Sequence, residues 1–246
     1  LPILLVAPAD NVTNFEGIQF LVENPYWEGA KISLYSAGEE SIASMPNIKV
    51  GKFITQVILQ NIEVEDIDLS NATDLRSAWV QNNPALQKLD LSYSTIWGQG
   101  DKETEGNGTY GSSLMVLGCP ILKEIKLPEK NELKAYRIDI ECLDALETFD
   151  MSNVKMVAEL SIGDLNKDFN LVYPELTIFY SEDGYAGTYF ACSENTFYRE
   201  STQAFLKANY TDIDPDDTVR RLGYTSSLSY DKNKGCRWRT LLNKQK

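Results

Sequence analysis

The sequence of 246 residues contains no histidine. This absence excludes Ser-His-Asp and Cys-His nucleophilic sites and histidine-ligated zinc or haem, because no other side chain titrates near neutral pH without help from its surroundings. Long apolar runs are also missing, and none approaches the roughly 20 residues that span a bilayer. The opening stretch Leu1–Ala9 has two prolines and no basic flank, so it is neither a signal peptide nor a membrane helix. With no initiator Met, we expect a trimmed or mature chain, which leaves room for a secretion signal or a lipid anchor upstream of residue 1.

Basic residues are scarce, since 23 Lys and Arg stand against 36 Asp and Glu for a net charge of −13. A chain this acidic repels phosphate backbones, so we expect no nucleic-acid partner. Closely spaced cysteines are absent too, which excludes a CxxC metal or redox motif. Cys192 and Cys236 either pair with each other or are free thiols, and their spacing does not decide between the two.

The sequence does contain a repeat. Blocks of six residues recur with apolar side chains at the first, fourth and sixth positions, and three successive blocks start eleven residues apart. Alternation over the last three positions predicts a short strand whose fifth residue points outward. Asn, Ser and Pro after the blocks favour turns over a continuing helix. One block cannot bury its apolar edge alone, so the repeat predicts a solenoid with a shared interior. The blocks are Val64–Leu69, Leu75–Val80, Leu86–Leu91, Leu122–Leu127, Leu133–Ile138, Leu146–Met151 and Val157–Ile162.

The stretch DLSNATDLRSAWVQNNPALQKLDLS, from Asp68 to Ser92, resembles the irregular leucine-rich repeats of Bacteroides-type bacteria. The resemblance covers about half of the chain and departs from the family at Val80, where a cysteine is expected. It implies a leucine-rich-repeat solenoid of β-rich α/β class, with short parallel strands stacked in a curved superhelix. It also implies a bacterial protein that is secreted or exposed on the cell surface. The family's asparagine positions, whose side chains bond turn backbone, are filled here by Asn71, Asn82 and Asn153.

The repeats predict three parts of the chain. Residues 57–180 hold the leucine-rich repeats with an inserted glycine-rich loop at 97–113. Residues 1–56 are expected to form an N-terminal cap or degenerate repeats, and 181–246 a C-terminal cap with short helices near 202–210 and 218–222, because solenoid ends need covering. The inserted loop opens like a calcium loop but has Ser112 where the bidentate glutamate belongs, so we expect no metal and no other cofactor.

Candidate functional residues lie at the outward positions of the blocks and at the inserted loop. Asp68, Trp79 and Asp90 occupy fifth positions, and Trp97 opens the loop. An exposed tryptophan with flanking acids is a typical anchor for a protein or a sugar. The alternative is that a neighbouring cap or loop covers Trp79. Asp68 and Asp90, 22 residues apart, are predicted to lie on neighbouring turns about 5 Å apart, close enough to raise a pKa.

We therefore expect a non-enzymatic recognition module, extracellular or on the cell surface, that binds a protein partner through the exposed face of the repeats. That partner is a host or a cell-surface protein. A glycan-binding module of a secreted bacterial protein is the second hypothesis. A hydrolase acting on glycosides through a carboxylate pair is the third.

Overall fold

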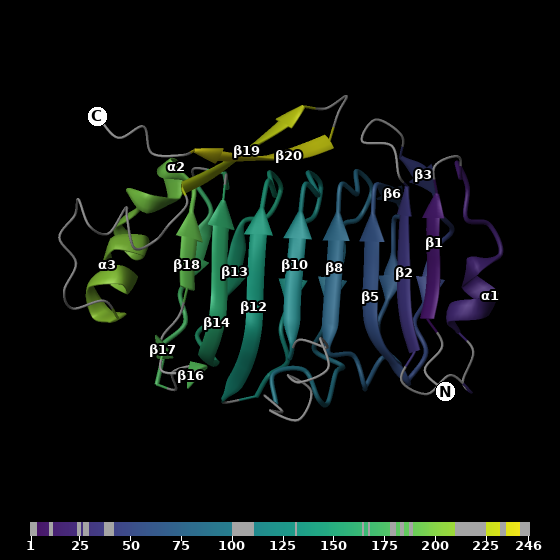
Figure 1. The fold of residues 1–246 in the computed structure, drawn as a ribbon, viewed down its shortest axis with the longest axis horizontal. Coiled ribbons are helices and arrows are strands. Elements are labelled where there is room, and N and C mark those ends of the chain that lie inside the picture. The colour runs from purple at the N-terminus through teal and green to yellow at the C-terminus, as the bar shows by residue number, and fades with distance from the viewer. Residues whose placement is uncertain are drawn as a thin grey trace.

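The computed structural model describes residues 4–9, 12–23, 26, 30–36, 42–99, 111–130, 132–163, 165–166, 168–177, 181–182, 185–186, 189–209, 225–231 and 235–241. Over these residues the chain forms a β-solenoid of about five stacked turns with little helix (Figure 1). One wall is a sheet of ten strands, which we call the main sheet, and all neighbours in it are parallel except the last two. Its order is β1 (Leu4–Ala9), β2 (Ala30–Ser36), β5 (Ile54–Gln60), β8 (Ser77–Gln81), β10 (Ser113–Leu117), β12 (Leu133–Glu141), β14 (Val154–Gly163), β18 (Tyr189–Cys192), β19 (Thr225–Asp231) and β20 (Gly235–Leu241).

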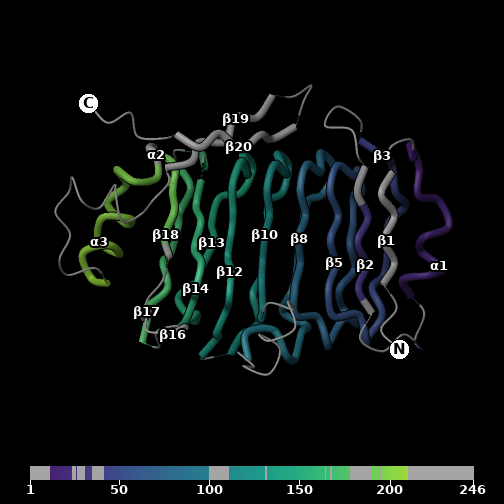
Figure 2. Tube along the Cα trace, in the orientation of Figure 1, coloured from purple at the N-terminus to yellow at the C-terminus, as the bar shows by residue number. Residues whose placement is uncertain are grey.

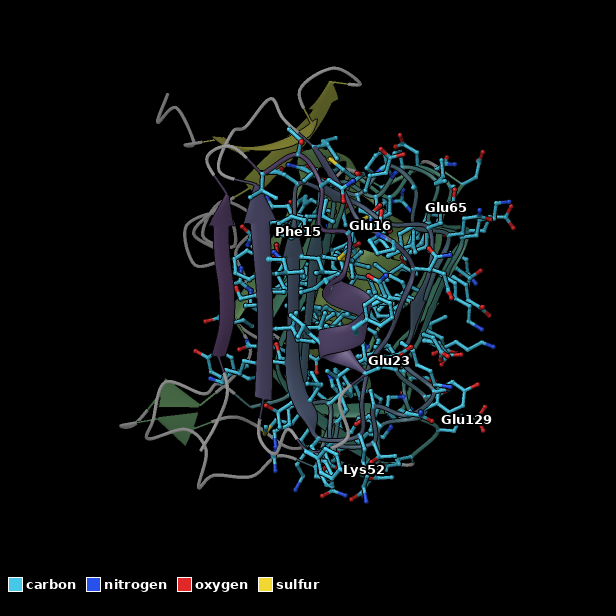
Figure 3. All side chains as sticks on the ribbon, turned by 90° about the vertical axis from the view of Figure 1, so that its right-hand side faces the viewer. Phe15, Glu16, Glu23, Lys52, Glu65 and Glu129 are labelled. Atoms are coloured by element: carbon cyan, nitrogen blue, oxygen red, sulfur yellow. The ribbon has the colours of Figure 1, made fainter. Side chains whose placement is uncertain are left out.

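The opposite wall, which we call the back wall, consists of short strands that pair in parallel. Figure 3 looks along the solenoid and shows the main sheet on one side, with Glu65 and Glu129 on the other. The back-wall pairs are β3 (Ala43–Ser44) with β6 (Ile62–Glu63), β4 (Ile48–Lys49) with β7 (Ile67–Asp68), β9 (Lys88–Asp90) with β11 (Glu124–Lys126), and β13 (Thr148–Asp150) with β15 (Asn170–Val172). A separate antiparallel pair joins β16 (Ser181–Glu182) to β17 (Tyr185–Ala186).

Each block of the sequence repeat forms half a turn of the solenoid. The block Leu75–Val80 contributes β8 to the main sheet, whereas the next block, Leu86–Leu91, contributes β9 to the back wall. The alternation continues through β11, β12, β13 and β14. Blocks eleven residues apart therefore lie on opposite walls, and only blocks about two steps apart share a wall. Leu69, Leu91 and Leu127 all belong to one hydrophobic core, which confirms the predicted shared interior.

The corners after the main-sheet strands use left-handed backbone. Asn61, Asn82, Gly118 and Cys142 each follow such a strand, with φ of 54°, 52°, 65° and 53°. Their backbone N–H groups continue the ladder, since Asn61 donates to the Gln81 carbonyl at 2.9 Å and Gly118 to the Glu141 carbonyl at 3.0 Å. Left-handed backbone favours glycine and asparagine. These residues turn the chain toward the back wall.

Short helices lie at the two ends of the solenoid, and Figure 2 shows the chain passing from one end to the other. Helix α1 (Ile18–Val22) buries Ile18 and Val22 at the N-terminal end. The main sheet also includes β1 and β2, so it continues across residue 56. Helices α2 (Glu194–Phe197) and α3 (Glu200–Asn209) follow β18, and α3 agrees with the helix predicted near 202–210. The helix predicted near 218–222 lies outside the described residues. Within the described part, the helices are too short or too polar to cross a membrane.

Candidate recognition face

The outward side chains of three neighbouring strands of the main sheet form one face. In β5, β8 and β10, Val57, Ala78 and Leu114 point into the core, and the residues between the core positions point away from it. Parallel register aligns the outward residues in rows, because Ile58 lies beside Trp79 and Trp79 beside Met115. We call this surface, which faces the viewer in Figure 1, the Trp79 face. Its partly exposed residues are Gln56, Ile58, Gln60, Ser77, Trp79, Gln81 and Met115, while Ser113 and Leu117 point to the same side and are buried.

The Trp79 face carries no charged residue, although the whole chain has a net charge of −13. Its middle row is apolar and consists of Ile58, Trp79 and Met115, each half-buried. Glutamine and serine fill most of the rows on either side, and the Trp79 indole Nε1 donates a hydrogen bond to Gln81 Oε1 at 3.3 Å. Trp79 is therefore partly exposed, and a polar neighbour holds its ring. The face has the composition of a recognition surface, with an apolar centre and a polar surround.

Asp68 and Asp90 lie on the back wall, so the structure separates them from Trp79. Asp68 ends β7 and Asp90 ends β9. The prediction that Asp68, Trp79 and Asp90 share one exposed face is wrong, because one block spans half a turn and sends its fifth residue to the opposite wall from its neighbours. No single surface therefore joins these candidate residues.

The back-wall acids are paired and hold turns. Asp68 Oδ1 accepts the backbone N–H of Ser70 at 2.8 Å, and Asp90 Oδ1 accepts that of Ser92 at 3.0 Å. Lys49 Nζ lies 3.6 Å from Asp68 Oδ2, and Lys88 Nζ lies 3.1 Å from Asp90 Oδ2. Each aspartate thus accepts from a turn and faces a lysine. This arrangement stabilises the corner after the short strand.

These contacts lower the pKa of both carboxyl groups. The Ser70 side chain, its backbone N–H and Lys49 outweigh slight burial and lower the pKa of Asp68. Burial acts to raise the pKa of Asp90, but hydrogen bonds from Ser92 and Lys88 reverse the direction and lower it. A general acid needs a pKa raised toward the working pH. The geometry of Asp68 and Asp90 therefore favours a structural role over a catalytic pair.

Trp97 is fully buried, so it does not contribute to an exposed surface. Its backbone N–H donates to Ser94 Oγ at 2.9 Å, and its indole Nε1 donates to the Ser113 carbonyl at 3.5 Å. Gly98 N–H donates to Ser112 Oγ at 2.6 Å. These hydrogen bonds join the two ends of the inserted loop above the core. Residues 100–110 lie outside the described residues. The glycines and acids that follow Trp97 wrongly suggested an exposed position.

Two further acids, which the sequence analysis did not single out, lie on the outward side of the main sheet. Asp139 and Glu141 are both fully buried in β12, beside Ser161 of β14. Burial raises the pKa of Asp139, and burial together with the Asp139 carboxylate raises the pKa of Glu141 to about 10. In the sequence they alternate with isoleucine, as solvated outward residues of any strand do. Alternation alone carries no signal of their burial.

The described residues form neither a metal site nor a reactive thiol site. No group of three or more Cys, Asp or Glu side chains in that part of the chain is arranged to hold a metal ion. Cys119, Cys142 and Cys192 are buried free thiols, so the alternative in which Cys192 pairs with Cys236 is not the one present. Burial raises the pKa of Cys119 and of Cys192 to about 12, which keeps both as unreactive thiols.

Comparison with known proteins identifies no relative: no family model, no curated protein and no solved structure matches this chain.

Proposed function

We propose that the protein is a non-catalytic recognition module that binds a protein partner through the Trp79 face. The observation that carries this proposal is the uncharged surface around an apolar row on a strongly acidic chain. The centres of protein interfaces are depleted in charge and enriched in aromatic residues and methionine, with a polar rim. Ile58, Trp79 and Met115 supply such a centre, and Gln56, Ser77 and the other polar residues supply the rim.

Trp79 is the proposed anchor of the interface. Tryptophan dominates binding energy where it is held in place and then desolvated by the partner. The hydrogen bond from Nε1 to Gln81 fixes the ring before binding, which reduces the conformational entropy lost on association. As the sequence resemblance implies, we propose a leucine-rich-repeat protein of a Bacteroides-type bacterium that works outside the cell or on its surface.

The test replaces Trp79 and compares it with a matched change on the back wall. We expect Trp79→Ala to weaken partner binding by at least about 2 kcal/mol, near 30-fold in Kd, while Lys126→Ala leaves it unchanged. A photo-crosslinking residue at position 79 or 126 captures the partner from surface extracts, and titration calorimetry then measures affinity for the purified partner. Circular dichroism confirms that both variants are folded. Equal capture from both positions, or unchanged affinity in Trp79→Ala, would contradict the proposal.

A neutral glycan is the second candidate, favoured by the amide groups beside the aromatic ring. Trp79 lies between Ser77 and Gln81 on its strand, and Gln60 lies beside Gln81. Aromatic rings with polar neighbours suit ligands that have both apolar and hydroxyl surfaces. A screen of neutral and anionic oligosaccharides, made with the native protein and with Trp79→Ala, distinguishes the candidates. Binding of neutral sugars that disappears in the variant would replace the protein partner by a glycan.

A further inference from the structure

Asp139 and Glu141 are ionisable residues, and their burial requires a physical explanation. They lie two residues apart on β12, so both point to the same side of the main sheet, away from the core. Both are nevertheless completely buried. Two ionised carboxylates in one buried site repel each other strongly, and burial of each also loses hydration. A stable structure therefore requires a compensating positive charge, a proton or both.

One positive charge comes from the same strand. Arg137 Nη2 donates to Asp139 Oδ2 at 2.8 Å, and Arg137 Nη1 lies 3.5 Å from Glu159 Oε2 on β14. The side chain of Arg137 is 35% exposed, and that of Glu159 is 37% exposed. Arg137 therefore neutralises Asp139 at the boundary of the buried site. It does not contact Glu141 in any hydrogen bond or ion pair that the described residues show.

Among the described residues, the donor to Glu141 is the neutral hydroxyl of Ser161. Glu141 Oε1 accepts this hydrogen bond from Ser161 Oγ at 2.7 Å. Its Oε2 and Asp139 Oδ1 are buried and accept from no donor among the described residues, while the two carboxyl groups are themselves within hydrogen-bonding range of each other. Gly163 of β14 leaves space for this group, since a Cβ there would lie 2.9 Å from Glu141 Cδ. Two neighbouring buried carboxyl groups, each with an oxygen that lacks a donor, can be completed by a single shared proton.

We propose that Asp139 and Glu141 bind one proton between them, as a carboxylic acid hydrogen-bonded to a carboxylate, and that this proton keeps the outward side of β12 and β14 packed. With the proton bound, Arg137 and the pair sum to zero charge. Loss of the proton to solvent leaves two adjacent carboxylates and a net charge of −1. The site is thus a pH-sensitive device built into the second half of the solenoid, separated from β8 in the sheet order by β10.

Among the described side chains, the other ionisable groups around the pair are Arg137 on β12, Glu159 on β14 and the thiol of Cys142 at the corner that follows β12. Tyr136 on β12 donates a hydrogen bond from its hydroxyl to Glu159 Oε1 at 3.2 Å. The facing positions of β10 are Ser113, Met115 and Leu117, which do not ionise. The raised pKa of Glu141, about 10, agrees with a proton retained at neutral pH.

Infrared spectroscopy tests the proton directly. At pH 7 the native protein should show the C=O stretching band of a protonated carboxyl group, which disappears as the pH rises through about 10. Glu141→Gln should remove the band, because the amide reproduces the donor and the acceptor without a titrating proton. Glu159→Gln, a matched change in the half-exposed acid beside the same arginine, should retain it. Absence of the band from the native protein at pH 7 would refute the shared proton even where a variant fails to fold.

Hydrogen exchange tests the structural effect. An opening that releases the pair to water loses the bound proton, so protection of the β12 and β14 amides should fall about tenfold per pH unit between pH 6 and 9, after correction for intrinsic exchange. Amides of β5 and β8 serve as the internal control and should change less. Glu141→Gln should abolish the pH dependence in β12 and β14. Equal pH dependence in the native protein and in Glu141→Gln would overturn the proposal.

Discussion

Side chains that look functional in the sequence serve the backbone in several places. Asp68, Asp90 and Asp150 each accept the N–H of the serine two residues later, so the recurring Asp-x-Ser element closes a turn. Asn83 accepts hydrogen bonds from a larger number of backbone groups. It is completely buried, and its Oδ1 accepts N–H groups of Ala85 and Leu86 at 3.0 Å each and of Val64 at 3.4 Å. Asn83 was not among the predicted asparagines, whereas the predicted Asn153 does bond backbone, since its Nδ2 donates to the Pro128 carbonyl at 2.8 Å.

Replacement of Asn83 should be costly. Asn83→Ala leaves buried N–H groups without an acceptor, so we expect the free energy of unfolding to fall by about 2–3 kcal/mol. Urea denaturation followed by circular dichroism measures the change. Gln87→Ala, an exposed position in the same half-turn, is the control and should change the free energy by less than about 0.5 kcal/mol. Equal stability of the two variants would show that Asn83 has no such role.

At the scale of elements, the corner residues decide where a strand can end. Gly118 lies between Asn82 and Cys142 in a column of left-handed corners, with φ of 65°. We expect Gly118→Val to lower the free energy of unfolding by at least about 1–2 kcal/mol, because a β-branched side chain is strained there. Gly118→Asn should be milder, since asparagine already occupies the corners at 61 and 82. Thermal unfolding compares the two, and a more stable valine variant would contradict the strain argument.

The elements also show which features of the fold can be predicted from the sequence. Apolar positions recurring at a fixed step were enough to predict strands that stack around one interior, because burial depends on periodicity. The 22-residue spacing predicted Asp68 and Asp90 on neighbouring turns, but the step did not reveal that the block between them, which contains Trp79, lies on the opposite wall. That placement depends on the corner backbone at Asn61 and Asn82, where the turn direction is set. The buried Asp139 and Glu141 also escaped prediction, since their alternation with Ile138 and Ile140 is the same as that of solvated outward residues.

The whole molecule distributes its charge unevenly between its walls. The back wall pairs acids with lysines: Lys88 Nζ lies 3.1 Å from Asp90 Oδ2 and 3.2 Å from Glu124 Oε2, and Lys126 Nζ lies 3.1 Å from Glu124 Oε1. Hydrogen bonds from Lys126 and Lys88 lower the pKa of Glu124. Across the solenoid, the Trp79 face has no charge at all. The described ion pairs of the back wall therefore lie on the opposite side of the solenoid from the uncharged Trp79 face.

These ion pairs predict how the free energy of unfolding falls at acid pH. Folded-state pKa values of Asp68, Asp90 and Glu124 lie below their ordinary values of 3.8, 3.8 and 4.5. The folded chain therefore binds fewer protons than the unfolded chain, and stability present above about pH 5 is lost as the pH falls through the lowered values. We expect Lys88→Ala to make this loss shallower between pH 5 and 3, with exposed Lys123→Ala as control. Urea titrations at each pH measure the slope, and an unchanged slope in Lys88→Ala would refute the assignment.

Among the described residues, left-handed corners recur at Asn61, Asn82, Gly118 and Cys142, and Asp-x-Ser turns recur at Asp68, Asp90 and Asp150, so the repeats are closed locally. A duplication of one stretch of about 22 residues would therefore add one strand to each wall and lengthen the molecule by about 4.8 Å, without disturbing residues elsewhere. Evolution can therefore change the length of the solenoid by changing the number of repeats, while the fold stays the same. A longer solenoid could contact more side chains of a partner.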